Sequence, residues 1–194
     1  AVIWTTTPWT IPGNRAIAYG DDIEYAVVEV TMISGSGAEL GQQEIGGQVV
    51  IREKIIVAES LIDSVTKTCG IVKYDILHRL KGADLSGTVC AHPLRGGGYN
   101  FDVPLLPGPH VTAEDGTGLV HTAPGHGVED YEVGRAHDLE VPQTVGDDGR
   151  FYEHVPQFAG EHVFKVDGKV ADALDAAGAL LARGKLRHSY PHSW

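Results

Sequence analysis

The sequence predicts an α+β fold that has a barrel-like or strongly curved mixed sheet at its centre and about three peripheral helices. Short runs of β-branched residues are numerous, Gly and Pro turns separate them, and apolar residues recur at helical spacing in only a few places. No series of long parallel strands alternating with helices is visible. Because 194 residues can bury a substantial core, residues 1–194 are expected to form a single domain.

The first half of the chain is predicted to be mostly strands. Arg15–Tyr19 and Glu24–Thr31 are expected to pair with each other across the Asp21-Asp22 turn. Ser34–Gly47 is rich in Gly, Ser and Gln, which predicts a loop or a hairpin tip. Further strands are predicted from β-branched and aromatic residues at 2–7, 49–57, 71–80 and 87–90.

Three helices are predicted from the spacing of apolar residues. The first, Glu59–Lys67, is expected to end before Gly70. The second is Val128–Leu139, and the third contains the regularly spaced residues Val166, Val170, Leu174, Ala177 and Leu181.

The second half of the chain adds shorter predicted strands and turns. Arg95–Asn100 is a Gly-rich loop, and Asp147-Asp148-Gly149 is typical of a hairpin turn. Strands are expected at 101–106, 111–112, 119–122 and, as a closing strand, 186–190.

Composition and charge limit the kinds of protein this chain can be. No apolar run approaches the ~20 residues that a membrane-spanning helix needs, so no membrane association is expected. The formal net charge is −11, whereas proteins that bind nucleic acid unaided are usually basic. Cys69 and Cys90 form no close-spaced pair, which favours the reducing cytoplasm. The start, AVIWTTTPW, has no signal-peptide character, and both ends indicate a fragment of a longer protein.

Two polar segments far apart in sequence contain the candidate site. The first, WTTTPWTIPGN at 4–14, places four hydroxyls at Thr5, Thr6, Thr7 and Thr10 and an amide at Asn14. On a strand, Thr5 and Thr7 would face one way and Thr6 the other. These groups could hold a polar ligand and a water molecule, although threonine also simply favours strands.

The second segment, GTGLVHTAPGHGVEDYEVG at 116–134, presents an imidazole and a carboxylate on either side of a tight turn. His121 ends a predicted strand, Pro124–Gly127 folds the backbone back, and Asp130 lies in the first turn of a predicted helix. These elements could line one small pocket. The alternatives are a packed, hydrogen-bonded histidine and an ordinary acidic residue that the helix dipole stabilises.

No motif for a metal ion, a phosphate or a nucleophilic serine accompanies these segments. His121, His126, Glu129 and Asp130 lie within ten residues, but their spacing matches neither HExxH nor a paired CxxC motif. His188 and His192 are separated by Pro191, which interrupts a helix. GxSxG and the phosphate-binding lysine loop are both absent from the sequence. We therefore expect neither a metal nor a cofactor.

The two polar segments resemble the editing (CP1) domain of isoleucyl-tRNA synthetases, a class I synthetase editing fold. Further pieces similar to that family are GYNFDVP, VFKVDGKVADAL and RHSYPHSW. The related valyl and leucyl editing domains usually have an Arg after the paired threonines and a PAHD-type loop. Here Thr7 and the letters APGHG stand at these places, which favours the isoleucyl family.

The resemblance implies a hydrolytic proofreading reaction. Its substrates would be valine esterified to the 3′ end of tRNA(Ile) and valyl-adenylate, and a positioned water would attack without a metal or a covalent intermediate. The resemblance implies that Asp130 binds the α-ammonium of the substrate and that His121 forms part of the wall around the amino acid side chain. The residues around the aminoacylated adenosine would be Trp4, Thr5, Thr6, Thr7, Thr10 and Asn14, with Thr5–Thr7 and Asp130 as the catalytic group.

The expected partners are the 3′ end of aminoacylated tRNA(Ile) and the catalytic domain of a parent synthetase, with the chain a cytoplasmic monomer. Three alternatives remain at this point. The chain could be a non-catalytic insertion that docks the tRNA acceptor end, although docking needs basic residues more than a polar pocket. It could be the editing domain of a valyl or leucyl enzyme. It could also be a free-standing metal-dependent hydrolase, which only the histidines favour.

Overall fold

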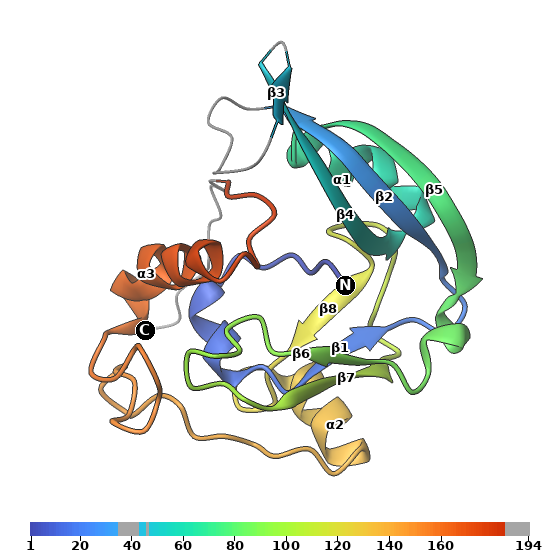
Figure 1. Cartoon of the computed structure of the whole chain (residues 1–194). Coiled ribbons are helices and arrows are strands. Elements are labelled where there is room, and N and C mark those ends of the chain that lie inside the picture. Colours follow the sequence, from blue (N-terminus) through green and yellow to red (C-terminus); the bar gives the residue numbers. More distant parts are fainter. Residues whose placement is uncertain (35–42, 46, 185–194) are drawn as a thin grey trace.

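The computed structural model describes residues 1–34, 43–45 and 47–184. In these ranges the strands form two four-stranded sheets, which Figure 1 shows as separate layers. The first sheet has the order β6 (Val89–Ala91), β7 (Asp102–Pro107), β1 (Ala16–Tyr19) and β8 (Leu119–Thr122). The second has the order β3 (Gln43–Ile45), β4 (Gln48–Ala58), β2 (Glu24–Ser34) and β5 (Ile71–Lys81). The α+β class is confirmed, while a barrel-like closure is not: the described strands remain in two sheets.

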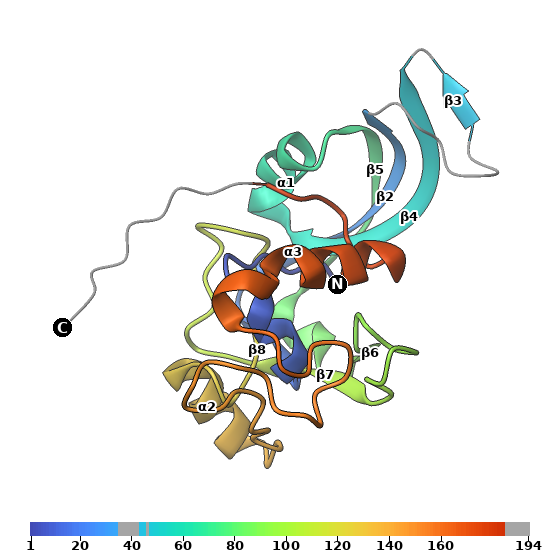
Figure 2. The same cartoon turned by 90° about the vertical axis from the view of Figure 1, so that its left-hand side faces the viewer.

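Three α-helices lie at the periphery of the described structure, in agreement with the predicted number. They are α1 (Ile62–Thr68), α2 (Val128–Ala136) and α3 (Val163–Ala176). Three short 3₁₀ helices accompany them: η1 (Pro8–Gly13), η2 (Glu59–Leu61) and η3 (Gly82–Leu85). Figure 2 shows α3 passing over η1, the blue helix, with α1 and α2 at opposite ends of the view. No helix in the described ranges is long and apolar enough to cross a bilayer.

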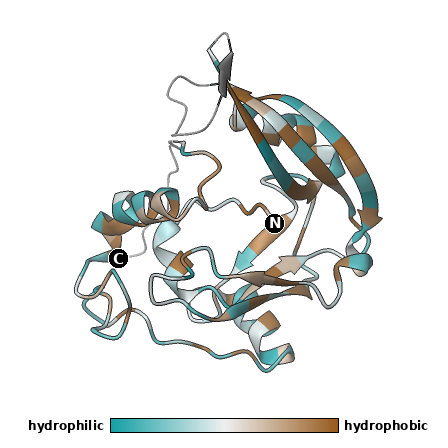
Figure 3. Cartoon of the chain, viewed as in Figure 1, coloured by the Kyte–Doolittle hydropathy of each residue, from teal (hydrophilic) through white to brown (hydrophobic). Residues whose placement is uncertain are grey.

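Two hydrophobic clusters stabilise the fold. The larger one fills the space between the two sheets and includes Tyr19, Val28 and Leu105; the strands that border it show the apolar (brown) positions of Figure 3. The smaller cluster lies under α3 and includes Val166, Val170 and Ile11 of η1. Because burial of apolar surface is the main stabilising force, Ile11 anchors η1 to the C-terminal helix.

A hydroxyl group and a glycine join the two sheets. The Tyr25 hydroxyl accepts the Gly20 N–H (3.1 Å) and donates to the Gly118 carbonyl (2.6 Å). The Ala58 N–H donates to the Thr117 carbonyl at 2.8 Å. Gly118 has φ +73°, and a Cβ there would lie 2.4 Å from Cβ of Ala58. Only glycine allows this approach, which places the start of β8 against the end of β4.

The expected pairing of the first two strands is wrong. Arg15–Tyr19 and Glu24–Thr31 do form strands, but β1 pairs in parallel with β7 and antiparallel with β8, whereas β2 pairs with β4 and β5. The Asp21-Asp22 turn therefore carries the chain from one sheet to the other. Both edges of β1 are already occupied, so no ladder with β2 can form.

Two other predicted strands do not form. Residues 2–7 and 111–112 have no strand assignment. In the first segment the Thr7 N–H donates to Thr5 Oγ1 (3.0 Å), and Pro8 starts η1. Such local side-chain bonds compete with a strand ladder.

The remaining predicted elements in the described ranges form with somewhat different bounds: β2 and β4 are longer than predicted, whereas two helices are shorter. Val128–Leu139 is helical only to Ala136, and the third helix ends at Ala176, before Leu181. The Asp147-Asp148-Gly149 turn joins an isolated bridge between Val145 and Phe151. Most of the Ser34–Gly47 loop and the closing strand at 186–190 lie outside the described residues.

Candidate functional site

A buried hydrogen-bonded group ties η1 to β8. The Thr10 hydroxyl lies 2.8 Å from Nε2 of His121, and Nδ1 of His121 lies 3.1 Å from Oδ1 of Asn14. The exposed fractions of Thr10, His121 and Asn14 are 7%, 8% and 3% respectively. Thr10 is held by η1, and Asn14 follows that helix directly, while His121 is the third residue of β8. The structure thus brings together three of the predicted site residues from segments more than 100 positions apart.

The imidazole of His121 is neutral. Burial lowers the pKa of His121 to about 4, with smaller contributions from His126 and His92. The Thr10 hydroxyl donates to the Thr7 carbonyl at 2.9 Å, so one ring nitrogen of His121 bonds to the Thr10 oxygen and the other bonds to the Asn14 amide. Both ring nitrogens are therefore used inside the protein, and only ring carbons remain to face a ligand.

The remaining threonines form a local turn beside this group. The hydroxyls of Thr5 and Thr7 lie 3.4 Å apart, and the Thr7 carbonyl accepts the backbone N–H of Thr10 at 3.0 Å. Thr5 and Thr7 are half-buried, whereas Thr6 is exposed. Trp4 is 46% exposed and lies against Gly116, where a Cβ would be 3.4 Å from Cβ of Trp4. Thr5 and Thr7 thus lie beside the Thr10 group, and Trp4 and Thr6 border it with solvent-exposed surface.

Asp130 holds the turn that follows β8. Gly127 precedes α2, and Oδ2 of Asp130 accepts the backbone N–H of Ala123 at 2.8 Å. Burial raises the pKa of Asp130, and the carboxylate of Glu129 adds to this, while the Ala123 N–H and His110 oppose it. The carboxylate is half-buried, so it combines a structural bond with access to a ligand.

The two segments meet where Gly13 approaches Ala123. A Cβ on Gly13 would lie 3.6 Å from Cβ of Ala123 and 3.0 Å from Cδ2 of His126. Next to this contact, the Arg15 N–H donates to the Thr122 carbonyl at 2.9 Å. The Thr10 group and the Asp130 carboxylate therefore border one junction between η1 and the end of β8. Among the described contacts, no direct bond joins Asp130 to the threonines at 5–7.

Two contacts at this junction were not predicted from the sequence. His126 Nε2 lies 2.6 Å from Oγ1 of Thr144, and its ring meets the Trp9 ring edge-on, with centroids 5.0 Å apart. The sequence suggested His126 only as a candidate metal ligand. In the described part of the chain no three His, Cys, Asp or Glu side chains come close enough to hold a metal ion. Thr144 had no signal in the sequence, since it lies in an irregular segment.

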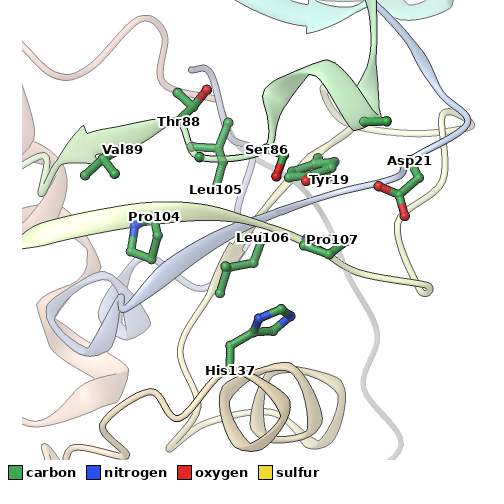
Figure 4. A pocket seen from close by; sticks show the side chains of 12 residues that line it. Tyr19, Asp21, Ser86, Thr88, Val89, Pro104, Leu105, Leu106, Pro107 and His137 are labelled. Atoms are coloured by element: carbon green, nitrogen blue, oxygen red, sulfur yellow. The ribbon is translucent and has the colours of Figure 1, made fainter.

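A hollow of about 520 Å³ lies elsewhere, against β7 and η3. Figure 4 shows Ser86 and Tyr19 on one side of the strands and His137 on the other. None of the predicted site residues lines it. The candidate site is therefore the polar junction of η1 and β8 and not this hollow.

Comparisons with known proteins agree with the resemblance found in the sequence. The isoleucine–tRNA ligase of Gluconobacter oxydans is 50% identical over 205 residues, covering 100% of this chain and 20% of that protein. Those of Pelagibacter ubique and Colwellia psychrerythraea are 40% and 44% identical, each over 100% of this chain. The chain thus spans about a fifth of the length of these ligases, 20% or 18%. No protein-family model matches it.

Solved structures show the same fold. GlLeuRS-CP1 superposes with a TM-score of 0.62 at 15% identity, over 97% of this chain and 83% of that one. The editing domain of the P. knowlesi cytosolic leucyl-tRNA synthetase gives a TM-score of 0.58 at 13% identity, over 89% and 80%. In sequence, then, the chain is a relative of isoleucine–tRNA ligases along its whole length, and its fold is similar to that of the CP1 editing domains of leucyl-tRNA synthetases.

Proposed function

We propose that this relative of isoleucine–tRNA ligases proofreads tRNA(Ile) by hydrolysing valyl-tRNA(Ile) and valyl-adenylate. The observation that carries the proposal is the junction at which the threonine-rich η1 segment and the Asp130 carboxylate border one polar site. The physical need follows from the small difference between the two amino acids. One methylene yields only ~1–3 kcal/mol of discrimination, a general range for which the isoleucyl enzyme is itself the standard example, so a second, smaller site must remove errors.

Asp130 is proposed to bind the α-ammonium of the misattached valine. One carboxylate oxygen already accepts the Ala123 N–H, which orients the group. The other can accept from an ammonium, in a charge-assisted bond that is stronger than a neutral one. Because burial raises the pKa of Asp130, the incoming positive charge also stabilises the ionised carboxylate.

The threonine segment is proposed to hold the ester and the attacking water. The hydroxyls of Thr5 and Thr7 lie on one side of a compact turn, where they can bind a water and the terminal ribose. The surroundings of the adenosine are completed by Trp4, Thr6, Thr10 and Asn14. An aminoacyl ester is already activated, so orientation of a water, aided by the free ribose hydroxyl, suffices without a metal or other cofactor.

His121 is proposed to form part of the wall that refuses isoleucine. Contacts alone give a small ratio, so refusal is steric. The hydrogen bonds of His121 to Thr10 and Asn14 fix the ring, which is what a rigid wall requires.

The wider context is proposed from the same relatives. Residues 1–194 would act as one editing domain, in a cytoplasmic and monomeric synthetase whose catalytic domain delivers the 3′ end of the tRNA. The net charge of −11 supports delivery by a partner, because an acidic surface attracts no phosphate backbone by itself.

The test is deacylation of valyl-tRNA(Ile) by this chain, with isoleucyl-tRNA(Ile) as the control. We expect loss of valine from the first and little change in the second, before and after treatment with a chelator. Binding of both tRNAs without hydrolysis would favour the docking insertion. A stoichiometric metal in the purified chain, with activity lost when the chelator removes it, would favour the metal-dependent hydrolase.

A further inference from the structure

His126 lies in a slot formed by η1 and the segment that contains Thr144. Its Nε2 lies 2.6 Å from Oγ1 of Thr144, and its ring is packed edge-on against Trp9. On a third side lies Gly13, where a Cβ would be 3.0 Å from Cδ2 of the imidazole. Burial lowers the pKa of His126, which favours the neutral ring. The side chain thus connects η1, the turn after β8 and the segment that contains Thr144.

The turn itself is packed at distances that only glycine allows. A Cβ on Gly125 would lie 2.8 Å from the Pro142 carbonyl oxygen, and one on Gly134 would lie 2.9 Å from the Pro124 ring. The backbone is therefore pressed between α2 and residues 142–144, and small shifts of those residues must be transmitted to the turn.

Thr144 is a firm anchor for the imidazole. It is 5% exposed, and its carbonyl accepts the backbone N–H of Tyr152 at 3.0 Å. The neighbouring residue Val145 bridges to Phe151, which belongs to the hydrophobic cluster under α3. The hydrophobic cluster under α3 therefore sets the position of the Thr144 hydroxyl that His126 contacts.

The same turn holds both ends of the Asp130 contact. The backbone N–H of His126 donates to the Ala123 carbonyl (2.8 Å), and the backbone N–H of Ala123 donates to Asp130 Oδ2 (2.8 Å). At the other end, the Tyr131 N–H donates to the Gly127 carbonyl at 2.9 Å and starts α2. A displacement of His126 must therefore move the donor to Asp130, the helix that holds it, or both.

We propose that the hydrogen bond between His126 and Thr144 is a positioning contact that sets the Asp130 carboxylate through the turn between them. This inference rests on the proposed function, in which Asp130 binds the substrate ammonium. His126 and Thr144 would be positioning residues and would not touch the substrate.

The test compares Thr144→Val, which removes the hydroxyl and keeps the shape, with Thr144→Ser, which keeps the hydroxyl. The first readout is amide hydrogen exchange of Ala123, with Val28 in β2 as the internal control. We expect Thr144→Val to accelerate Ala123 exchange about tenfold, the effect of one hydrogen bond, and to leave Val28 unchanged. Thr144→Ser should exchange like the unmodified chain. Should Thr144→Val not fold, Thr144→Ala takes its place.

The second readout is the deacylation of valyl-tRNA(Ile). A misplaced Asp130 weakens ground-state binding, so KM should rise about tenfold in Thr144→Val and recover in Thr144→Ser. A merely less stable protein would lower kcat with KM unchanged. Unchanged Ala123 exchange in Thr144→Val overturns the positioning role, as does an unchanged KM in an active chain. Absence of hydrolysis by the unmodified chain would instead count against the proposed function, and the exchange experiment would still decide the contact.

Discussion

At the scale of single residues, His121 joins two elements without carrying a charge. Its ring fills the buried space between Thr10 and Asn14 and bonds to both. Any substitution that lacks two suitably placed polar atoms leaves buried groups without partners, which costs more than the bonds themselves contribute. The residue therefore has a structural role whatever it does for selectivity.

We predict two effects of His121→Ala. Loss of the ring leaves the Thr10 and Asn14 side chains without their partner, so the free energy of unfolding should fall by about 1–3 kcal/mol in urea titrations. The enlarged pocket should also admit isoleucine, so the variant should deacylate isoleucyl-tRNA(Ile). His78→Ala is the matched control, because His78 is exposed on β5. Loss of valyl-tRNA hydrolysis without any isoleucyl-tRNA hydrolysis would contradict the wall and leave a catalytic or folding role.

Asp130→Asn separates the charge of the carboxylate from its bond to the turn. The amide oxygen can still accept the Ala123 N–H, so stability should change little. The missing charge-assisted bond to the ammonium should lower kcat/KM for valyl-tRNA(Ile) by about 10- to 100-fold. Glu129→Gln is the control, since Glu129 is an exposed neighbour. Activity equal to that of the control would make Asp130 a purely structural residue.

Residue types and a tight turn predicted that two distant segments meet, and the structure brings them together. Thr10, Asn14 and His121 lie together, and Asp130 lies at the turn between β8 and α2. The contact between His126 and Thr144 could not be predicted, because it joins a turn to an irregular segment and has no periodic pattern. The catalytic roles of these residues stay predictions.

At the scale of elements, the joint between the two sheets depends on a few polar groups. The Tyr25 hydroxyl contacts backbone groups of Gly20 and Gly118, at the ends of β1 and β8. Tyr25 itself belongs to β2 and is fully buried. One side chain therefore sets the distance between strands of different sheets.

Tyr25→Phe is predicted to destabilise this joint. Removal of the hydroxyl leaves the buried Gly118 carbonyl and the partly buried Gly20 N–H without this partner, so we expect a loss of about 1–3 kcal/mol in the free energy of unfolding. Tyr74→Phe, on the partly exposed β5, should cost much less. Equal urea midpoints for the two variants would show that the joint does not depend on this hydroxyl.

The positions of the strands were predicted more reliably than the pairing between them. β-Branched runs indicated β2, β4 and β5 because local preference and burial favour the same conformation there. The pairing of β1 depends on β7 and β8, which lie far along the chain, so a short turn after β1 was a misleading guide. The strand predicted at residues 2–7 does not form for a local reason, because hydrogen bonds of the threonine side chains outweigh their strand preference.

At the scale of the whole molecule, no local signal in the sequence indicated that the strands would divide between two sheets. The lack of barrel closure in the described strands could therefore not be predicted either. The chain is acidic overall, yet His92 and His121 are buried, and His92 bonds to the Ile11 carbonyl and the Leu94 N–H. Buried neutral histidines make the fold sensitive to acid.

We therefore predict that stability falls as the pH drops from about 6.5 towards 4. Burial lowers the pKa of both His92 and His121 from 6.5 to about 4, so in this window the unfolded chain binds protons that the folded chain refuses. The stability that each neutral histidine contributes is fully present above its unfolded pKa of 6.5 and is lost as the pH falls below that value. The loss amounts to about 2 kcal/mol per histidine between pH 7 and pH 5. Asp130 has a raised pKa and acts in the opposite direction, because its folded form holds a proton more readily.

Urea titrations at pH 7 and pH 5 measure this loss, and His92→Gln separates the two histidines. The glutamine amide can bond but does not titrate, so the pH-dependent loss should fall by about half in this variant. His78→Gln, at an exposed position, should keep the full loss. If His92→Gln loses as much stability at pH 5 as the unmodified chain, His92 does not contribute to the acid sensitivity.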